Sequence, residues 1–328
     1  MGALRTSYPR FKRSGDAPPM ALTADDIEIL SRVFRYRFLR ADDLYRLFPD
    51  RSPDRLSRRL TWLYRNQYLD RPIAQIDRFR SGGSQAFVYG LDNAGARLLA
   101  ERLGLSITSG EWKARNRTYT RENLDHTLSI ARFMVDLELA CRRSGNVELI
   151  SFDEVLADAP ERTRRRPQPG RWSVPVRWAD ASGEVTVAPD AIFGLRLTQA
   201  DGRTVRTFVF LEIDRGTMTI APAKRVRESS AFLHRTSILR KLLTYGTSHH
   251  LQLHREHLGI PIARVLTLTT SLARAEAMRE TAFNLVTRPM RLPPALFLFG
   301  ALEASDDPLA TAWIDAAGEP TRLTPSPP

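Results

Sequence analysis

The chain has 328 residues, 42% of them hydrophobic, and its 49 Lys and Arg against 37 Asp and Glu give a formal net charge of +12. This apolar content is ample for a packed core, and the length predicts two domains or one with a large extension. The single cysteine, Cys141, excludes an internal disulfide and lies in an apolar stretch, which predicts a buried side chain rather than a nucleophile. The apolar runs are too short for a bilayer, and no signal-peptide pattern is present, so we expect a cytoplasmic protein with no membrane partner.

The first hundred residues carry a surplus of positive charge and two helical patterns. Residues 1–103 contain 19 basic and 12 acidic residues, which attracts polyanions without specifying a sequence. We interpret residues 1–20 as a flexible basic arm. A first helix is predicted over 22–38, with Thr23 as its cap, and a second over 40–48, ending before Pro49.

An arginine-rich amphipathic helix is predicted over 51–67. Ser52 and Pro53 provide its start, and Leu56, Leu60 and Leu63 form one buried stripe. Arginines and a tryptophan fall mainly off that stripe, in positions suited to the major groove. The alternative interpretation is an ordinary solvated face. The predicted DNA-contact residues on or next to this helix are Arg51, Arg55, Arg58, Arg59, Trp62 and Arg65.

A glycine-tipped hairpin follows this helix. Strands are predicted over 68–79 and 84–91, and Arg78 and Arg80 lie at the tip, where a wing would meet the DNA backbone or minor groove. A closing helix is predicted over 93–103. This order of elements is typical of a winged helix-turn-helix, which we assign to residues 21–104 as a domain that binds double-stranded DNA.

The remainder of the chain is predicted to be an α/β domain over 122–302, which makes the protein α+β overall. A linker over 105–121 precedes it, and a tail over 303–328 follows it. Its expected elements are a helix over 122–143, strands over 147–152, 172–178, 184–197 and 204–213, a helix over 229–244, a strand over 265–269, a helix over 271–284 and a last strand over 296–299. The charged, proline-broken loop 161–170 is either a second nucleic-acid contact or a solvated insertion.

Three acidic residues stand at the ends of two neighbouring predicted strands. Glu212 and Asp214 alternate by two on one strand, and Asp190 begins the strand before it, so the three carboxylates are expected to converge. Such a cluster binds Mg²⁺ or Mn²⁺, which activates water for phosphodiester cleavage. The alternative is that these acids pair with nearby arginines.

The pattern PDA followed by FLEID, after a helix that carries Glu138, resembles the PD-(D/E)XK restriction-endonuclease-like core. The resemblance implies that Asp190 and Glu212 are metal ligands and that Glu138 is an auxiliary acid. Asp214 occupies the position of the motif lysine. Lys224 could supply a displaced cation in its place, and so could Lys241, which lies on the following helix. The resemblance implies a Mg²⁺-dependent endonuclease with Glu138, Asp190, Glu212, Asp214 and Lys241 as its catalytic residues.

From about residue 22 to 299 the chain is also similar to the replication-relaxation family of plasmids and integrated mobile elements. The similarity rests on the segments LTADDIEIL, YRFLRADDLYRLF, RRLTWLYRNQYLDR, YGLDNAGARLL, HTLSIARF, FLEIDRGTM and RKLLTY. It implies a part in plasmid replication, DNA relaxation or transfer, with replication or transfer proteins as partners.

Four of the six histidines cluster between His249 and His257. On one helix, His250, His254 and His257 share a face that can hold zinc, although a surface segment with fortuitous histidines is the alternative. Tyr245 is conceivable as a nucleophile, but no other pattern supports that role.

Two hypotheses follow from the sequence. In the first, a DNA-binding module is fused to an active metal-dependent nuclease domain. In the second, the α/β domain is a degenerate nuclease fold in a non-catalytic initiator or a transcriptional regulator. A homodimer is a common solution for a DNA reader of this kind.

Overall fold

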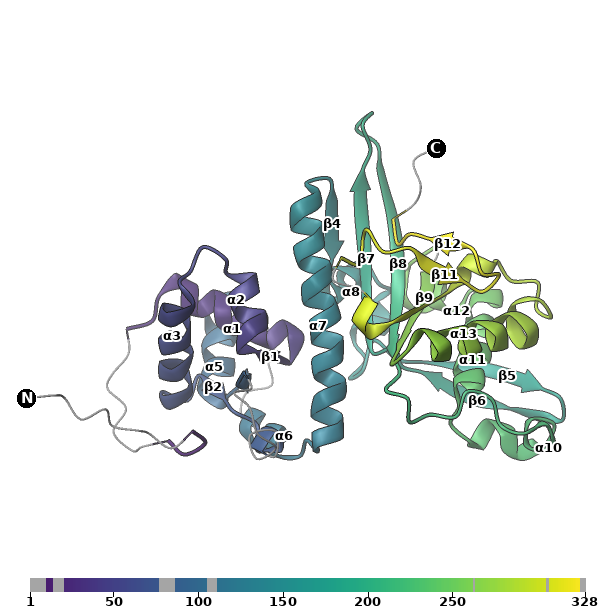
Figure 1. The fold of residues 1–328 in the computed structure, drawn as a ribbon, viewed down its shortest axis with the longest axis horizontal. Coiled ribbons are helices and arrows are strands. Elements are labelled where there is room, and N and C mark those ends of the chain that lie inside the picture. Colours follow the sequence, from purple (N-terminus) through teal and green to yellow (C-terminus); the bar gives the residue numbers. More distant parts are fainter. Residues whose placement is uncertain are drawn as a thin grey trace, which may run out of the picture. The chain divides into compact units, whose positions relative to one another are not determined.

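The computed structural model describes residues 10–13, 21–76, 86–104, 111–261, 263–304 and 307–324. The chain divides into two compact units, Met1–Val135 and Asp136–Pro328 (Figure 1). Its secondary structure is mixed, as the sequence predicts, with helices in both units and a seven-stranded mixed sheet in the second.

Three helices open the first unit: α1 (Ala24–Tyr36), α2 (Ala41–Leu47) and α3 (Pro53–Arg65). Thr23 caps α1 as predicted, because its side chain accepts the Asp26 N–H while the Asp26 carboxylate accepts the Thr23 N–H. Ser52 occupies the N-cap position of α3, but its side chain makes no capping hydrogen bond, contrary to our expectation. Pro53 at the first turn therefore provides the start signal.

A three-stranded antiparallel sheet in the order β1-β3-β2 completes this arrangement. It consists of β1 (Phe38–Arg40), β2 (Leu69–Asp70) and β3 (Val88–Leu91). Over the described residues 71–76 the strand predicted for 68–79 is wrong, because Pro72 has no N–H for a ladder and leads into a 3-10 turn, η1 (Ile73–Gln75). The rest of that predicted strand lies outside the described residues. The Gln75 side-chain amide instead donates to and accepts from the Val88 backbone, at 2.9 and 2.8 Å.

Helices also follow this sheet: α5 (Asn93–Leu103), with the predicted bounds, and α6 (Trp112–Arg117) inside the predicted linker. The side chains of Trp112 and Asn116 are buried, and Asn116 donates to Asp70 and to the Leu91 carbonyl at 3.0 Å. This part of the expected linker is therefore packed structure. In the predicted basic arm, Arg13 is bound to Asp92 and to the carbonyls of Tyr64 and Leu69.

The long helix α7 (Arg121–Ser144) contains the boundary between the units, and strands follow it. The sheet of the second unit has the order β12-β11-β10-β9-β8-β7-β4. The strands β8, β9 and β10 are parallel to one another, whereas β7 is antiparallel to β8, and β4 to β7. The members are β4 (Val147–Ile150), β7 (Ala191–Thr198), β8 (Thr204–Ile213), β9 (Ala263–Thr269), β10 (Phe297–Ala301), β11 (Trp313–Asp315) and β12 (Pro320–Thr321).

A separate two-stranded sheet pairs β5 (Trp172–Trp178) with β6 (Ala181–Val187), so the expected strand 184–197 is in fact two strands that belong to different sheets. Short helices α8 (Phe152–Ala157) and α9 (Glu161–Arg164) precede β5. The predicted tail also differs from the structure, since β11 and β12 extend the main sheet and Trp313 is buried.

Two helices, α11 (Ile238–His250) and α13 (Leu272–Ala282), pack against the face of the sheet to which Phe208 and Phe210 of β8 point. The short helix α12 (Leu253–Leu258) follows α11, and α10 (Lys224–Arg227) and the turn η2 (Ser230–His234) precede it. One hydrophobic core contains side chains of β8, β9, β10, α11 and α13. The helix expected over 229–244 differs in its bounds. It starts at Ile238, because the Ser237 side chain caps its first turn there.

The connections β8-α11-β9 and β9-α13-β10 join parallel strands. The carboxyl ends of β8 and β9 and the first turns of α11 and α13 consequently meet at one edge of the sheet, where open α/β sheets place their functional groups. Within the described residues, no helix is long and apolar enough to cross a bilayer.

Candidate functional site

The helix α3 presents one outward face of cationic and aromatic side chains. Arg55 and Arg58 are exposed, Trp62 is 41% exposed and Arg65 is half-buried. These four positions are spaced three, seven and ten residues from the first, so they lie along one side of the helix. Leu56, Leu60 and Leu63 are buried on the other side. The predicted division of this helix into an apolar and an arginine-rich face is therefore present in the fold.

Two arginines of the predicted set are engaged elsewhere. Arg59 donates to the buried carboxylate of Asp26, with Nε 2.5 Å from Oδ1 and Nη2 in contact with Oδ2, and to the Ala21 carbonyl. Burial alone raises the pKa of Asp26, but hydrogen bonds from Arg59 and Thr23 outweigh burial and hold that pKa below its usual value. Arg51 pairs with Asp25 at 2.6 Å, although both side chains are exposed. Arg59 therefore links α3 to the start of α1.

The predicted wing residues Arg78 and Arg80 lie outside the described residues. The described residues on either side of this region end at Ile76 and resume at Ala86. The two strands of the predicted hairpin pair with each other as β2 and β3, with Leu69 opposite Leu91.

In the second unit, Asp190 and Glu212 lie next to each other across the β7-β8 ladder, because Ala191 pairs with Leu211. The Asp190 N–H donates to the Leu211 carbonyl at 3.0 Å, and its carboxylate accepts the Ile213 N–H at 2.8 Å. Asp190 is half-buried and Glu212 is buried. The adjacency of these two predicted ligands follows from the strand register.

Both oxygens of Glu212 accept hydrogen bonds from α11. Lys241 Nζ lies 2.5 Å from Oε2, and Tyr245 Oη lies 2.5 Å from Oε1. Burial raises the pKa of Glu212, the Lys241 ammonium opposes that shift and the charge of Asp190 adds to it. Burial lowers the pKa of Lys241, but the Glu212 charge outweighs burial and raises it. Lys241 therefore supplies a cation at this carboxylate, from the helix that the sequence suggested.

Tyr245 is part of this network through its spacing from Lys241. The two residues are four apart on α11, and both point to the carboxylate of Glu212. Their spacing is visible in the segment RKLLTY, although it did not lead to a prediction of this contact for Tyr245. Burial and the Glu212 charge raise the pKa of Tyr245 well above its usual value. A phenol with a raised pKa is a poor nucleophile, which disfavours the conceivable role of Tyr245 in covalent chemistry.

Asp214 does not join the other two acids, contrary to the expected convergence of three carboxylates. It accepts hydrogen bonds from Arg274 Nε at 2.7 Å, Thr269 Oγ1 at 2.6 Å and Gly216 N at 3.1 Å. Burial raises its pKa, but the bonds from Arg274, Thr269 and Gly216 outweigh burial and lower it. Asp214 thus anchors the first turn of α13. The sequence did not predict the role of Arg274, because this residue belongs to no recognisable motif.

The remaining predicted cations and acids have local partners. Glu138 on α7 pairs with Arg142 one turn later, at 2.5 Å. Lys224 pairs with Glu228 at 3.9 Å. Cys141 is buried, and burial raises its thiol pKa to about 12, which agrees with a structural side chain.

The donor set around Glu212 is compatible with magnesium. No group of three or more His, Cys, Asp or Glu side chains suited to a metal occurs among the described residues. Magnesium, however, commonly uses one or two carboxylates together with water and substrate phosphate, and Asp190 and Glu212 are such a pair. Each carboxylate oxygen also has a second lone pair beyond the hydrogen bond that it accepts.

The histidine cluster does not form the helical zinc face considered for it. The chain leaves α11 at His250, passes through Gln252 with φ 56° and begins α12 at Leu253. Buried His257 makes a 2.8 Å hydrogen-bond contact between Nε2 and the Pro169 carbonyl, whereas His250 is exposed. The break in the helix therefore removes the shared spacing.

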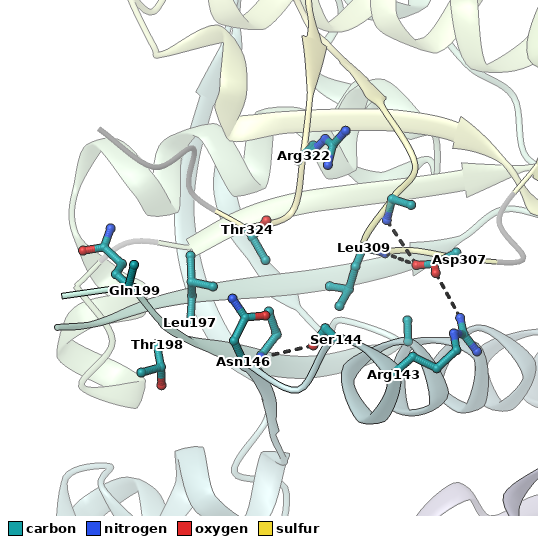
Figure 2. Close-up of a pocket in the computed structure, with 14 residues that line it drawn as sticks. Arg143, Ser144, Asn146, Leu197, Thr198, Gln199, Asp307, Leu309, Arg322 and Thr324 are labelled. Carbon is teal, nitrogen blue, oxygen red and sulfur yellow. Dashed lines mark hydrogen bonds and ion pairs between the residues drawn. The ribbon is translucent and has the colours of Figure 1, made fainter. Parts of the chain in front are cut away.

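A separate cavity of about 540 Å³ lies beside the C-terminal end of α7 and the C-terminal end of β7 (Figure 2). Asp307 accepts from Arg143 at 3.0 Å and from the N–H groups of Leu309 and Ala310 at 3.1 Å on its rim. The predicted site residues do not line this cavity.

Comparison with known proteins places the chain in a family. No curated protein and no solved structure matches it. The family model described as replication-relaxation matches residues 30–241, which is more than half of the chain and extends from α1 to Lys241. The matched range includes α3, the Asp190-Glu212 pair and the lysine beside it, and the protein therefore belongs to the replication-relaxation family.

Proposed function

We propose that this protein, whose family indicates a role in DNA replication or relaxation, binds duplex DNA through α3 of a winged helix-turn-helix. The observation that carries the proposal is the outward face of α3, with exposed Arg55, Arg58 and Trp62 along one side. Guanidinium groups pair bidentately with guanine and with phosphates, and an amphipathic helix fits the major groove.

The order of the elements supports this assignment. Three helices and a small antiparallel sheet occur in the sequence of a winged helix, and buried Leu56, Leu60 and Leu63 fix which side of α3 faces away from the core. Expected partners are plasmid or mobile-element DNA, a second copy of the chain and other replication or transfer proteins, in the cytoplasm.

The test is an affinity measurement with the full chain. We expect Arg55→Ala with Arg58→Ala to weaken binding to a fluorescent 30-bp duplex at least about tenfold at 0.1 M KCl. The slope of log K against log[KCl] should also fall by about 2, since each lost phosphate contact removes about 0.9.

Arg97→Ala with Arg102→Ala is the matched control, because both arginines are exposed on α5 and the charge change is equal. The α3 assignment is wrong if the two double variants bind alike.

A second candidate function is metal-dependent DNA cleavage by the α/β unit, similar to the PD-(D/E)XK nucleases. It is favoured by Asp190, Glu212 and Lys241, which bring two carboxylates and a cation to one sheet edge. Asp190 and Glu212 would hold the Mg²⁺ or Mn²⁺ ion, which stabilises charge on a phosphodiester and lowers the pKa of bound water.

The protein's own groups have defined tasks in this candidate. Lys241 keeps a positive charge beside Glu212, because the Glu212 charge raises the lysine pKa. Tyr245 holds the second oxygen of Glu212 and fixes the orientation of the carboxylate. Asp214 and Arg274 tie the loop after β8 to α13 and position the strand end that carries Glu212.

Supercoiled plasmid provides the test for cleavage. We expect nicking by the purified full chain with Mn²⁺ or Mg²⁺, its loss on chelation, and at least a hundredfold lower rate for Glu212→Gln. Cys141→Ser serves as the control, since that thiol lies outside the site. Intact plasmid with either metal, at protein concentrations that saturate the DNA, would leave a non-catalytic initiator or regulator as the function.

A further inference from the structure

A second cationic surface lies on the α/β unit, in the segment from α9 to the start of β5. Residues 161–171 contain a single acid, Glu161, and the five arginines Arg162, Arg164, Arg165, Arg166 and Arg171. This is the loop for which the sequence left two interpretations open, a nucleic-acid contact and a solvated insertion.

The segment is fixed to the protein by buried polar contacts. Thr163 is fully buried, and its hydroxyl donates to the His257 carbonyl at 2.5 Å. The His257 ring contacts the Pro169 carbonyl through Nε2 at 2.8 Å and lies 5.4 Å from the Trp172 ring. These contacts hold both ends of the loop, so its arginines are presented from a defined backbone.

Two of the five arginines are used within the fold. Arg165 pairs with Glu161 at 2.5 Å, and Arg162 donates to the Glu256 carbonyl at 3.1 Å. The other three, Arg164, Arg166 and Arg171, are exposed and make no ion pair with a described residue. We call these three residues the 164–171 patch. A guanidinium group that is not neutralised by an ion pair has the charge and the planar geometry to bind a phosphate bidentately.

We infer that the 164–171 patch binds the sugar-phosphate backbone of duplex DNA, as a second contact surface separate from α3. Between Arg166 and Arg171 the chain has only Pro167, Gln168, Pro169 and Gly170, and the next residue, Trp172, is buried. This segment therefore offers no exposed large apolar or aromatic side chain of the kind that a membrane or a protein interface needs. The absence of an aromatic side chain in this stretch likewise favours backbone contact over base stacking. The inference rests on the proposed binding of DNA by this protein.

The consequence is a longer footprint with a non-specific component. Contacts to phosphate add affinity on any sequence and increase the salt dependence. The patch therefore contributes to affinity on all duplexes, whereas the α3 face includes side chains able to read bases.

The test uses the full chain with Arg164→Gln, Arg166→Gln and Arg171→Gln combined. On a random 40-bp duplex we expect at least about tenfold weaker binding at 0.1 M KCl and a salt slope lower by about 2 to 3. Arg235→Gln, Arg288→Gln and Arg291→Gln form the matched control, since these arginines are also exposed in the same unit. The corresponding Arg→Lys triple variant should retain the salt slope.

A photocrosslinking residue at exposed Gln168, in an otherwise unchanged chain, provides a measurement that does not depend on the folding of the triple variant. Crosslinks to duplex DNA are expected, and their absence while the chain is saturated with DNA would overturn the inference. One outcome is that the double alanine variant of α3 weakens binding while the triple glutamine variant of the 164–171 patch binds DNA with the same affinity as its control. In that case the patch proposal fails and the α3 proposal stands. If the unchanged chain binds no duplex, both fail.

Discussion

Arg59→Ala is expected to lower the free energy of unfolding by about 3 kcal/mol, because it leaves the Asp26 carboxylate buried without its cation. Asp26 has no exposed side-chain surface, and Arg59 makes two hydrogen bonds to it. The measurement is urea denaturation of the full chain at pH 7, followed by the fluorescence of its tryptophans. Arg58→Ala, one residue away and exposed, is the control and should change stability by less than about 0.5 kcal/mol.

The acid limb of the stability profile provides a second readout for Arg59. The pKa of Asp26 lies below its usual value in the fold, so its favourable contribution is present above the unfolded pKa, about 3.9, and disappears as the pH falls through the folded pKa. In Arg59→Ala, burial acts on Asp26 without the arginine and raises its pKa. As the pH falls, the stability difference between wild type and variant should therefore begin to shrink at the raised pKa of Asp26 in the variant and go on shrinking down to the lowered pKa in the wild type. A difference that is constant with pH would show that Arg59 acts through packing alone.

For Lys241→Ala we expect a loss of about 2 kcal/mol in the same denaturation experiment. Removing one partner of a fully buried ion pair costs about 3 to 5 kcal/mol, and solvent reaches the 34% exposed Lys241 side chain, which reduces the effect. The remaining Glu212 keeps the hydrogen bond from Tyr245. This prediction holds whether or not the site cleaves DNA.

The cause of that loss can be isolated by combining Lys241→Ala with Glu212→Gln. If the uncompensated carboxylate is responsible, the double variant should recover at least half of the lost stability. Burial raises the pKa of Glu212, so the Lys241→Ala chain should lose stability as the pH rises from about 4.3 through the folded pKa. No recovery in the double variant, or no such pH dependence, would assign the loss to packing of the lysine stem.

Much of the fold follows from local signals. The helix over 93–103 and the strands over 172–178 and 204–213 have the predicted bounds, because capping residues and turn residues mark their ends in the sequence itself. The errors occur where a neighbour far along the chain decides. The sequence predicts a strand through residues 71–75. In the structure the side chain of Gln75, and not the backbone of a strand, pairs with the backbone of Val88.

The sites divide in the same way. The alternation of residues placed Glu212 and Asp214 on one side of β8, and the register of β7 places Asp190 beside Glu212. Glu212 and Asp214 have different partners because two helices reach the same sheet edge. Lys241 of α11 binds Glu212, and Arg274 of α13 binds Asp214. Nothing in the spacing of the acids indicates which cation arrives at which carboxylate.

By itself, the sequence determined the arginine-rich face of α3 and the spans of elements such as α5, α7, β5 and β8, since each depends on residues within a few turns of one another. Only the tertiary structure decided that Arg58 is exposed while Arg59 is held by Asp26, 33 positions away, and that Asp214 is held by Arg274, 60 positions away. The physical reason is that a charge on a helix face can pair only with its own helix until packing brings another element within hydrogen-bond distance. That event separates the arginines held within the fold from those that stay exposed.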